Sequence, residues 1–178
     1  MSLVFVALGS NIDSERNLRE AVLRLSQHCR LVAVSPVYET APVRNTEQPN
    51  FLNAAALIET DLTATELKAH VLRVIEQELG RVRTEDKNAP RTIDLDIALF
   101  ADQDLDSGAQ ALCDPDILRY AHIAVPLAGI APQMRHPTTG QTLQEIAQSL
   151  PDSGLVLCPD VVLWPETADK PIEEMRNV

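Results

Sequence analysis

The chain has 178 residues, enough for one domain with a substantial core, and 45% of them are hydrophobic while only 3% are aromatic. A formal net charge of −11 and a pI of about 4.7 argue against nucleic acid or an anionic membrane as the main partner. The three cysteines form no Cys-x-x-Cys pair, so neither a disulfide framework nor a zinc site is indicated and reduced thiols are expected.

The N-terminal segment is apolar, but it lacks basic residues and is too short to span a bilayer. We therefore expect a buried strand over residues 3–8 in a protein of the cytoplasm. A turn follows this strand, and Asp13 or Ser14 can cap a helix after it. The apolar face of this helix is expected to carry Leu18, Ala21, Val22 and Leu25.

Two further strands are predicted after this helix. Residues 31–38 are rich in valine, although Pro36 indicates an edge strand or a bulge. A loop with two prolines follows, and residues 51–60 form the next apolar segment of strand length.

A second helix is predicted next in the chain. Thr63 and Glu66 form a capping-box pattern at its start, and Gly80 is placed to end it. The residues of this helix that are expected to point inward are Leu67, Val71, Val74, Ile75 and Leu79.

Apolar and acidic residues alternate over residues 93–99, which predicts a half-buried strand. Asp94 and Asp96 share one face, and the opposite face is expected to carry Ile93, Leu95, Ile97 and Leu99. Two carboxylates separated by two residues on a strand lie roughly 6–7 Å apart. They can hold one or two Mg²⁺ ions together with substrate phosphates. The alternative is an acidic, solvated strand face.

The order of these elements is β-α-β-β-α-β, which is typical of an α+β ferredoxin-like sandwich with an antiparallel sheet under two helices. C-terminal additions follow this unit. Short helical pieces are predicted between residues 112 and 150, and an extra strand or hairpin is predicted within residues 155–164. We expect one domain over residues 1–165 and an acidic tail over residues 166–178.

Basic residues precede the acidic strand, at Arg81, Arg83 and Arg91. Guanidinium groups suit phosphate oxygens because they donate two hydrogen bonds in a fixed fork. The alternative is a solvated loop over residues 81–90 whose charges are balanced by its own acidic residues. An acidic protein that binds phosphates needs positive charge at the site. The acid pair can supply it by holding metal ions, and the neighbouring arginines can supply it directly.

Six short segments, in this order, resemble the 6-hydroxymethyl-7,8-dihydropterin pyrophosphokinase family of folate biosynthesis. They are Ala7–Asn11, Val37–Thr40, Phe51–Ala55, Ile75–Glu76, Leu79–Arg83 and Pro90–Ile97. The resemblance continues at Val125–Pro132. It implies the ferredoxin-like fold already expected, and an enzyme that transfers the β,γ-diphosphate of ATP to the hydroxymethyl group of a reduced pterin and releases AMP.

The resemblance also implies roles for particular residues. Asp94 and Asp96 would carry two Mg²⁺ ions, and Arg81, Arg83 and Arg91 would close over the triphosphate as parts of a mobile loop and its exit. The residues that match nucleotide contacts of the family are Glu76, Arg83, Arg91 and Ile97. The residues that match its pterin pocket are Thr40, Val43, Phe51, Asn53 and His122. A monomer that binds ATP and a pterin, with no nucleic acid and no membrane, is expected.

The segment over residues 115–122 departs from the family pattern because it is slightly shorter. His122 falls where a second stacking aromatic is expected, and Tyr120 falls where an arginine is expected, with Arg119 beside it as the candidate substitute. The alternative for His122 is a core histidine whose nitrogens bond to the backbone. Three functions therefore stay open: an active pterin pyrophosphokinase, a relative that acts on another hydroxymethyl pterin, and a non-catalytic pterin- or nucleotide-binding module.

Overall fold

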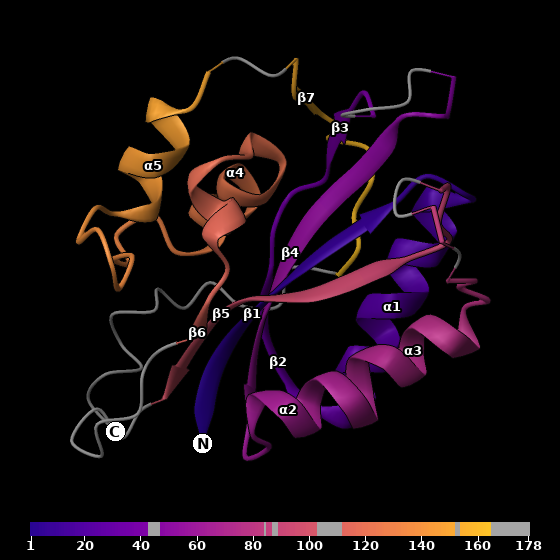
Figure 1. The fold of residues 1–178 in the computed structure, drawn as a ribbon, viewed down its shortest axis with the longest axis horizontal. Coiled ribbons are helices and arrows are strands. Elements are labelled where there is room, and N and C mark those ends of the chain that lie inside the picture. The colour runs from indigo at the N-terminus through magenta and orange to yellow at the C-terminus, as the bar shows by residue number, and fades with distance from the viewer. Residues whose placement is uncertain (43–46, 84, 87–88, 103–111, 152–153, 165–178) are drawn as a thin grey trace.

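The protein is described by a computed structural model covering residues 1–42, 47–83, 85–86, 89–102, 112–151 and 154–164. An antiparallel sheet lies between two layers of helices, as Figure 1 shows. Val43 and the expected tail over residues 166–178 lie outside the described residues.

The centre of the sheet is strand β1 (Ser2–Ser10). It pairs antiparallel with β4 (Phe51–Thr60) on one side and with β5 (Asp94–Asp102) on the other. This arrangement places the ends of three strands side by side, since Gly9 pairs with both Asn53 and Asp94. The α+β ferredoxin-like fold expected from the sequence is confirmed.

The strand expected over residues 31–38 is divided into β2 (Arg30–Val34) and β3 (Tyr38–Thr40), which both pair with β4. Pro36 lies in the gap between them because it has no N–H group to continue the ladder. Ser35 bridges the gap: its N–H donates to the carbonyl of Ala55 (2.9 Å), and its hydroxyl accepts from the Ala55 N–H (2.8 Å).

Short strands form the edges of the sheet among the described residues. β6 (Leu112–Cys113) pairs with β5, and β7 (Val156–Leu157) pairs with β3. β7 corresponds to the extra strand expected within residues 155–164, and it is only two residues long.

One face of the sheet is covered by α1 (Ser14–His28) and by a second, composite helix. All four residues expected to face the core from α1 are buried, so its predicted apolar face is confirmed. Asp13 occupies the N-cap position as predicted, with a φ of 43°, but its side chain makes no capping hydrogen bond. Between α1 and the sheet lies the first core cluster, which includes Val4, Leu25 and Ile93.

The composite helix consists of α2 (Ala64–Leu67), a π-helix (Lys68–Leu72) and α3 (Arg73–Glu78). The capping box at its start is present as predicted, because Thr63 and Glu66 bond to one another's backbone N–H groups. The π-helix was not predicted. Its turn holds more residues than an α-helical turn, so the residues after it are rotated relative to the buried face that the sequence pattern predicts. Leu72 is fully buried, whereas Val74, which was expected to point inward, is only half-buried.

A second core cluster covers the other face of the sheet, under η3 (Pro115–Leu118), α4 (Ala121–Ile130) and α5 (Leu143–Ser149). A β-bulge in β5 changes which of its residues face each cluster. Phe5 pairs with Leu99 and Val6 with Ile97, so Ala98 is an extra residue in the ladder. Leu99 therefore packs in the second cluster, and its predicted place on the same face as Ile97 is wrong.

His136 is buried beside β6, where its Nε2 lies 3.1 Å from the sulfur of Cys113. Its Nδ1 accepts hydrogen bonds from the backbone N–H groups of Thr138 and Thr139, at 3.3 Å each. These contacts suit a neutral ring with its proton on Nε2. Burial lowers the pKa of His136 below its ordinary value of 6.5, and it raises the pKa of the Cys113 thiol to about 11.

We expect the free energy of unfolding to decrease as the pH falls below about 6.5, the ordinary pKa of histidine. Because the folded protein lowers the pKa of His136, the unfolded chain binds more protons in this range, and protonation favours unfolding. Urea denaturation of the parent and of His136→Asn at several pH values measures the effect. The variant should be less stable at neutral pH and should lose less stability on acidification; parallel pH profiles would contradict this assignment.

Candidate active site

A cavity of about 300 Å³ opens where β1, β4 and β5 end beside the start of α4. It brings together residues that are far apart in the sequence and were singled out from it. They are Thr40, Phe51, Asn53, Arg91, Asp94, Asp96 and His122. Asp114, Asp116 and Gln48 also line the cavity, and sequence reasoning did not find them.

The acid pair occupies the sheet face that carries the cavity. Asp94 is held by two arginines: its Oδ1 lies 2.8 Å from Nη1 of Arg81 and its Oδ2 lies 2.5 Å from Nη1 of Arg91. Asp96 has a different partner, since its Oδ1 lies 2.9 Å from Nζ of Lys68 in the π-helix. Both carboxylates of the acid pair therefore already have cationic partners.

Arg81 is positioned by the end of the composite helix. Gly80 has a φ of 75°, and two hydrogen bonds close the helix, from the Gly80 N–H to Gln77 (3.0 Å) and from the Arg81 N–H to Glu76 (2.9 Å). The chain thus turns at Gly80 and directs Arg81 back toward the sheet. Its guanidinium, only 11% exposed, donates to the carbonyl of Ile93 at 2.6 Å as well as contacting Asp94.

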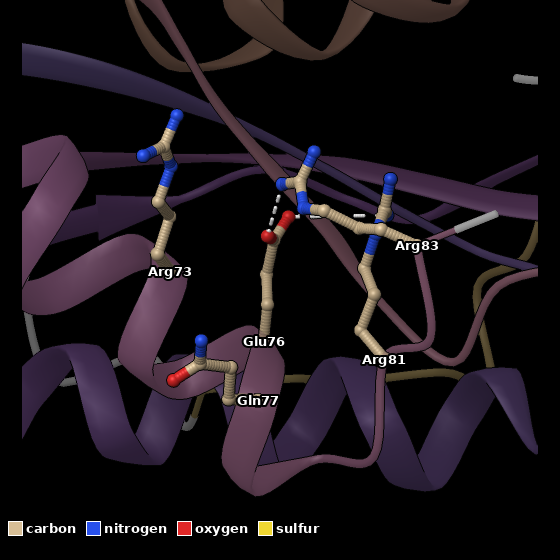
Figure 2. A pocket seen from close by; sticks show the side chains of 5 residues that line it. All are labelled: Arg73, Glu76, Gln77, Arg81 and Arg83. Atoms are coloured by element: carbon tan, nitrogen blue, oxygen red, sulfur yellow. Dashed lines mark hydrogen bonds and ion pairs between the residues drawn. The ribbon is translucent and has the colours of Figure 1, made fainter. Parts of the chain in front are cut away.

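Glu76 lies at the centre of a neighbouring basic pocket. Its side chain is almost fully buried, with Oε1 accepting from the Leu95 N–H (3.0 Å) and Oε2 accepting from Arg83 (2.6 Å). The hydrogen bond and the charge of Glu76 raise the pKa of Arg83. Figure 2 shows Glu76 between Arg73 on one side and Arg81 on the other. These residues and Gln77 line a second cavity, of about 500 Å³.

The residues expected at a pterin line the first cavity together with the acid pair, and they do not line the basic pocket. Phe51 and Asn53 point from β4 into the first cavity, and Asn53 Nδ2 donates to the hydroxyl of Thr40 at 2.9 Å. The guanidinium carbon of Arg91 lies 5.7 Å from the centre of the Phe51 ring. Burial lowers the pKa of His122, against the opposing charge of Asp116, so its ring is neutral near pH 7.

Two expected residues have other surroundings, and a third cannot be placed. Ile97 is 7% exposed and packs in the first core cluster, so it lines neither of the two cavities. Arg119 is largely exposed and contacts Asp116 at 3.5 Å, and it does not line them either. Val43 cannot be placed because it lies outside the described residues.

Hard oxygen ligands are present at the acid pair, and this chemistry fits Mg²⁺. Among the described residues, no group of three or more His, Cys, Asp or Glu side chains is arranged to hold a metal ion. This arrangement suits an ion that binds through one or two carboxylates and completes its shell with water and substrate phosphates. It does not suit a structural site built entirely from protein ligands.

Residues 5–132 match the family model described as 7,8-dihydro-6-hydroxymethylpterin-pyrophosphokinase (HPPK). The chain belongs to the HPPK family. Its membership confirms the family expected from the sequence and, with it, the expected class of enzyme, a pyrophosphoryl transferase of folate biosynthesis. No helix in the described part of the chain is long and apolar enough to cross a membrane.

Curated relatives of this HPPK chain carry the same activity in their names. The 2-amino-4-hydroxy-6-hydroxymethyldihydropteridine pyrophosphokinase of Pseudomonas aeruginosa is 38% identical over 159 residues, which cover 88% of this chain and 96% of the relative. The protein of that name from Bacillus subtilis is 40% identical over 148 residues, covering 81% of this chain and 87% of the relative.

A solved structure of an HPPK-DHPS protein in complex with substrates has a similar fold, with a TM-score of 0.62 and 15% sequence identity. The match covers 83% of this chain and 43% of that one, so this chain spans less than half of the solved protein. At this identity the likeness concerns the fold alone.

Proposed function

We propose that the protein transfers the pyrophosphoryl group of ATP to the hydroxymethyl group of 6-hydroxymethyl-7,8-dihydropterin and releases AMP. The observation that carries the proposal is the contact of Asp94, one acid of the pair, with Arg81 and Arg91 at the border between two cavities. One cavity is lined by arginines and the other by Phe51, Asn53 and His122. This is the arrangement needed to bring a polyphosphate and a flat heterocycle together.

On the phosphate side, binding and charge neutralisation are the main tasks of the protein. Asp94 and Asp96 would hold one or two Mg²⁺ ions, which supply positive charge to the phosphate oxygens. Arg83 and Arg73 reach into the basic pocket, and Arg91 lies between Asp94 and Phe51. These guanidinium groups would bind the triphosphate and orient it toward the pterin.

On the pterin side, the cavity offers a stacking face and polar groups. Phe51 supplies the ring, and the neutral ring of His122 can supply a second flat surface. The Asn53 amide can both donate and accept hydrogen bonds, and Thr40 fixes its orientation. A reduced pterin, which is flat and rich in donors and acceptors, would match this set of groups.

The reaction is tested by incubating the purified protein with ATP, Mg²⁺ and 6-hydroxymethyl-7,8-dihydropterin, and by measuring AMP and ADP separately. AMP formed in equal amount to the pterin diphosphate is the expected result. ADP would indicate simple kinase or ATPase chemistry, and neither product would leave only a binding module. A parallel reaction with a different hydroxymethyl pterin would reveal a relative with another substrate.

We expect Phe51→Ala to weaken pterin binding by roughly 1–3 kcal/mol, because the ring supplies both stacking and burial. His122→Ala should also weaken it, whereas His122→Phe should preserve or strengthen it by keeping a flat apolar ring in the cavity. Titration calorimetry with a non-reactive ATP analogue present measures all three variants. ATP affinity should change little in each. Pterin affinity equal to that of the parent in His122→Ala would place His122 outside the binding site.

The proposal includes a monomeric enzyme of the cytoplasm whose catalytic domain covers residues 1–165. The three free cysteines are in keeping with an intracellular, reducing environment. Light scattering of the purified protein measures its oligomeric state directly.

A further inference from the structure

The two acids of the pair are held in different ways. Asp94 contacts two arginines that are only 11% and 20% exposed, and Arg81 is further fixed by the carbonyl of Ile93. Asp96 contacts Lys68, and the side chains of this second pair are 45% and 50% exposed. The Asp96 pair is therefore the one whose partner can leave without disturbing the core.

Lys68 reaches Asp96 from the first residue of the π-helix, which packs against β5. A π-turn in an otherwise α-helical segment is rare and often lies at a functional site. Leu67 on one side of Lys68 and Val71 and Leu72 on the other are buried, so the backbone that carries Lys68 is fixed. Its ammonium group contacts Asp96, which lines the first cavity.

We propose that Lys68 occupies the cation position at Asp96 in the empty protein and leaves it when a divalent cation binds. The inference rests on the proposed function, because it takes the acid pair as the cation ligands. An ammonium group 2.9 Å from Oδ1 of Asp96 both engages that oxygen and repels an incoming cation. Lys68 thus lowers the affinity of the free protein for a divalent cation, and phosphates that arrive with the cation offer the ammonium group a new partner.

The expected effect is moderate because the pair is half exposed to solvent, where ion pairs are weak and screened. Replacing Lys68 with Gln removes both the competing contact and the repulsion. We expect the affinity of the nucleotide-free protein for Mn²⁺, as a probe for Mg²⁺, to increase about threefold to tenfold. Lys68→Arg keeps the charge and should leave the affinity close to that of the parent.

Arg30→Gln is the matched control for the loss of one positive charge. Arg30 pairs with Glu59 toward the other end of the sheet, where Glu59 lies opposite Leu3 of β1. Asp96→Asn identifies the site itself. Mn²⁺ binding to all five proteins, parent included, is measured by electron paramagnetic resonance without nucleotide, and thermal unfolding shows that each variant is folded.

Tighter binding by Lys68→Gln alone, with weaker binding by Asp96→Asn, is the expected result. Equal or weaker binding by Lys68→Gln compared with Arg30→Gln would overturn the role of Lys68 and leave the proposed function standing. Unchanged binding by Asp96→Asn would overturn the cation site on which both depend. No binding by any of the proteins, Lys68→Gln included, would overturn the role of Lys68, because its removal should expose the site. The release of AMP tests the proposed function separately, so the two failures are distinguishable.

Discussion

Asp96→Asn is expected to lower the rate of pyrophosphoryl transfer at least ~10²-fold, the scale of losing one strong electrostatic stabiliser (~3 kcal/mol). Asp94→Asn should have an effect of the same size, because each change removes one of the two carboxylates that would hold the metal ions under the proposed function. Initial rates of AMP release at saturating ATP and pterin, over a range of Mg²⁺ concentrations, measure the loss. Excess Mg²⁺ should restore little of the lost rate if the carboxylates fix the positions of the ions as well as their occupancy.

Asp94→Asn and Asp96→Asn should differ in stability, although the same loss of rate is expected for both. Asp96 and Lys68 are half exposed, so Asp96→Asn should leave the melting temperature nearly unchanged. Asp94 accepts from two mostly buried guanidinium groups, and its neutralisation should cost about 1–3 kcal/mol of unfolding free energy. The structure thus revises the expectation from the alternating strand pattern, which treats the two acids as equivalent.

Asp61→Asn is the control for these variants. Asp61 follows β4 at the far end of the sheet and contacts the N-terminal ammonium group with a largely exposed side chain. Its replacement should leave both rate and stability close to the parent values. Near-normal activity in Asp94→Asn and Asp96→Asn would contradict the hypothesis that these residues hold metal ions. Equal rate losses in all three variants would indicate a general effect of net charge.

Local patterns predicted the elements well because neighbouring residues decide them. The spacing of Leu18 and Leu25 marks the buried face of α1, and the Thr63–Glu66 capping box is a contact within one turn. Alternation on β4 likewise predicted that Phe51 and Asn53 share a face, and both line the first cavity. These features depend on backbone periodicity and need no knowledge of the rest of the chain.

The bulge at Ala98 and the π-turn that begins at Lys68 were not predictable in this way. Each inserts one residue into a regular pattern, and only the packing of the sheet against its helices shows where the insertion lies. The contact of Lys68 with Asp96 spans 28 residues, and a surface lysine on a predicted helix carries no signal of such a partner. The sequence therefore predicted many residues of the candidate site, but it did not predict which of them contact one another.

Glu76 illustrates the same limit, because its isolated position in the sequence resembles that of any helical glutamate. In the fold it is 2% exposed and links the composite helix to β5 through the Leu95 N–H. It also accepts from Arg83 at 2.6 Å and lies 3.8 Å from Nη1 of Arg81. One buried carboxylate thus orients two of the three arginines of the basic pocket, Arg81 and Arg83, and satisfies a strand donor.

Glu76→Ala should consequently lower the free energy of unfolding by about 3 kcal/mol, since it leaves a buried N–H and a mostly buried guanidinium with fewer partners. Glu76→Gln should cost less, because its amide oxygen can still accept from Leu95. The matched control is Glu78→Ala, two residues away in α3, whose carboxylate pairs with Arg24 in an exposed setting and should contribute less than about 1 kcal/mol. Urea denaturation of the three variants and the parent measures these differences. Equal losses in Glu76→Ala and Glu78→Ala would mean that the buried network adds nothing beyond an ordinary surface ion pair, and that Glu76 does not hold the basic pocket together.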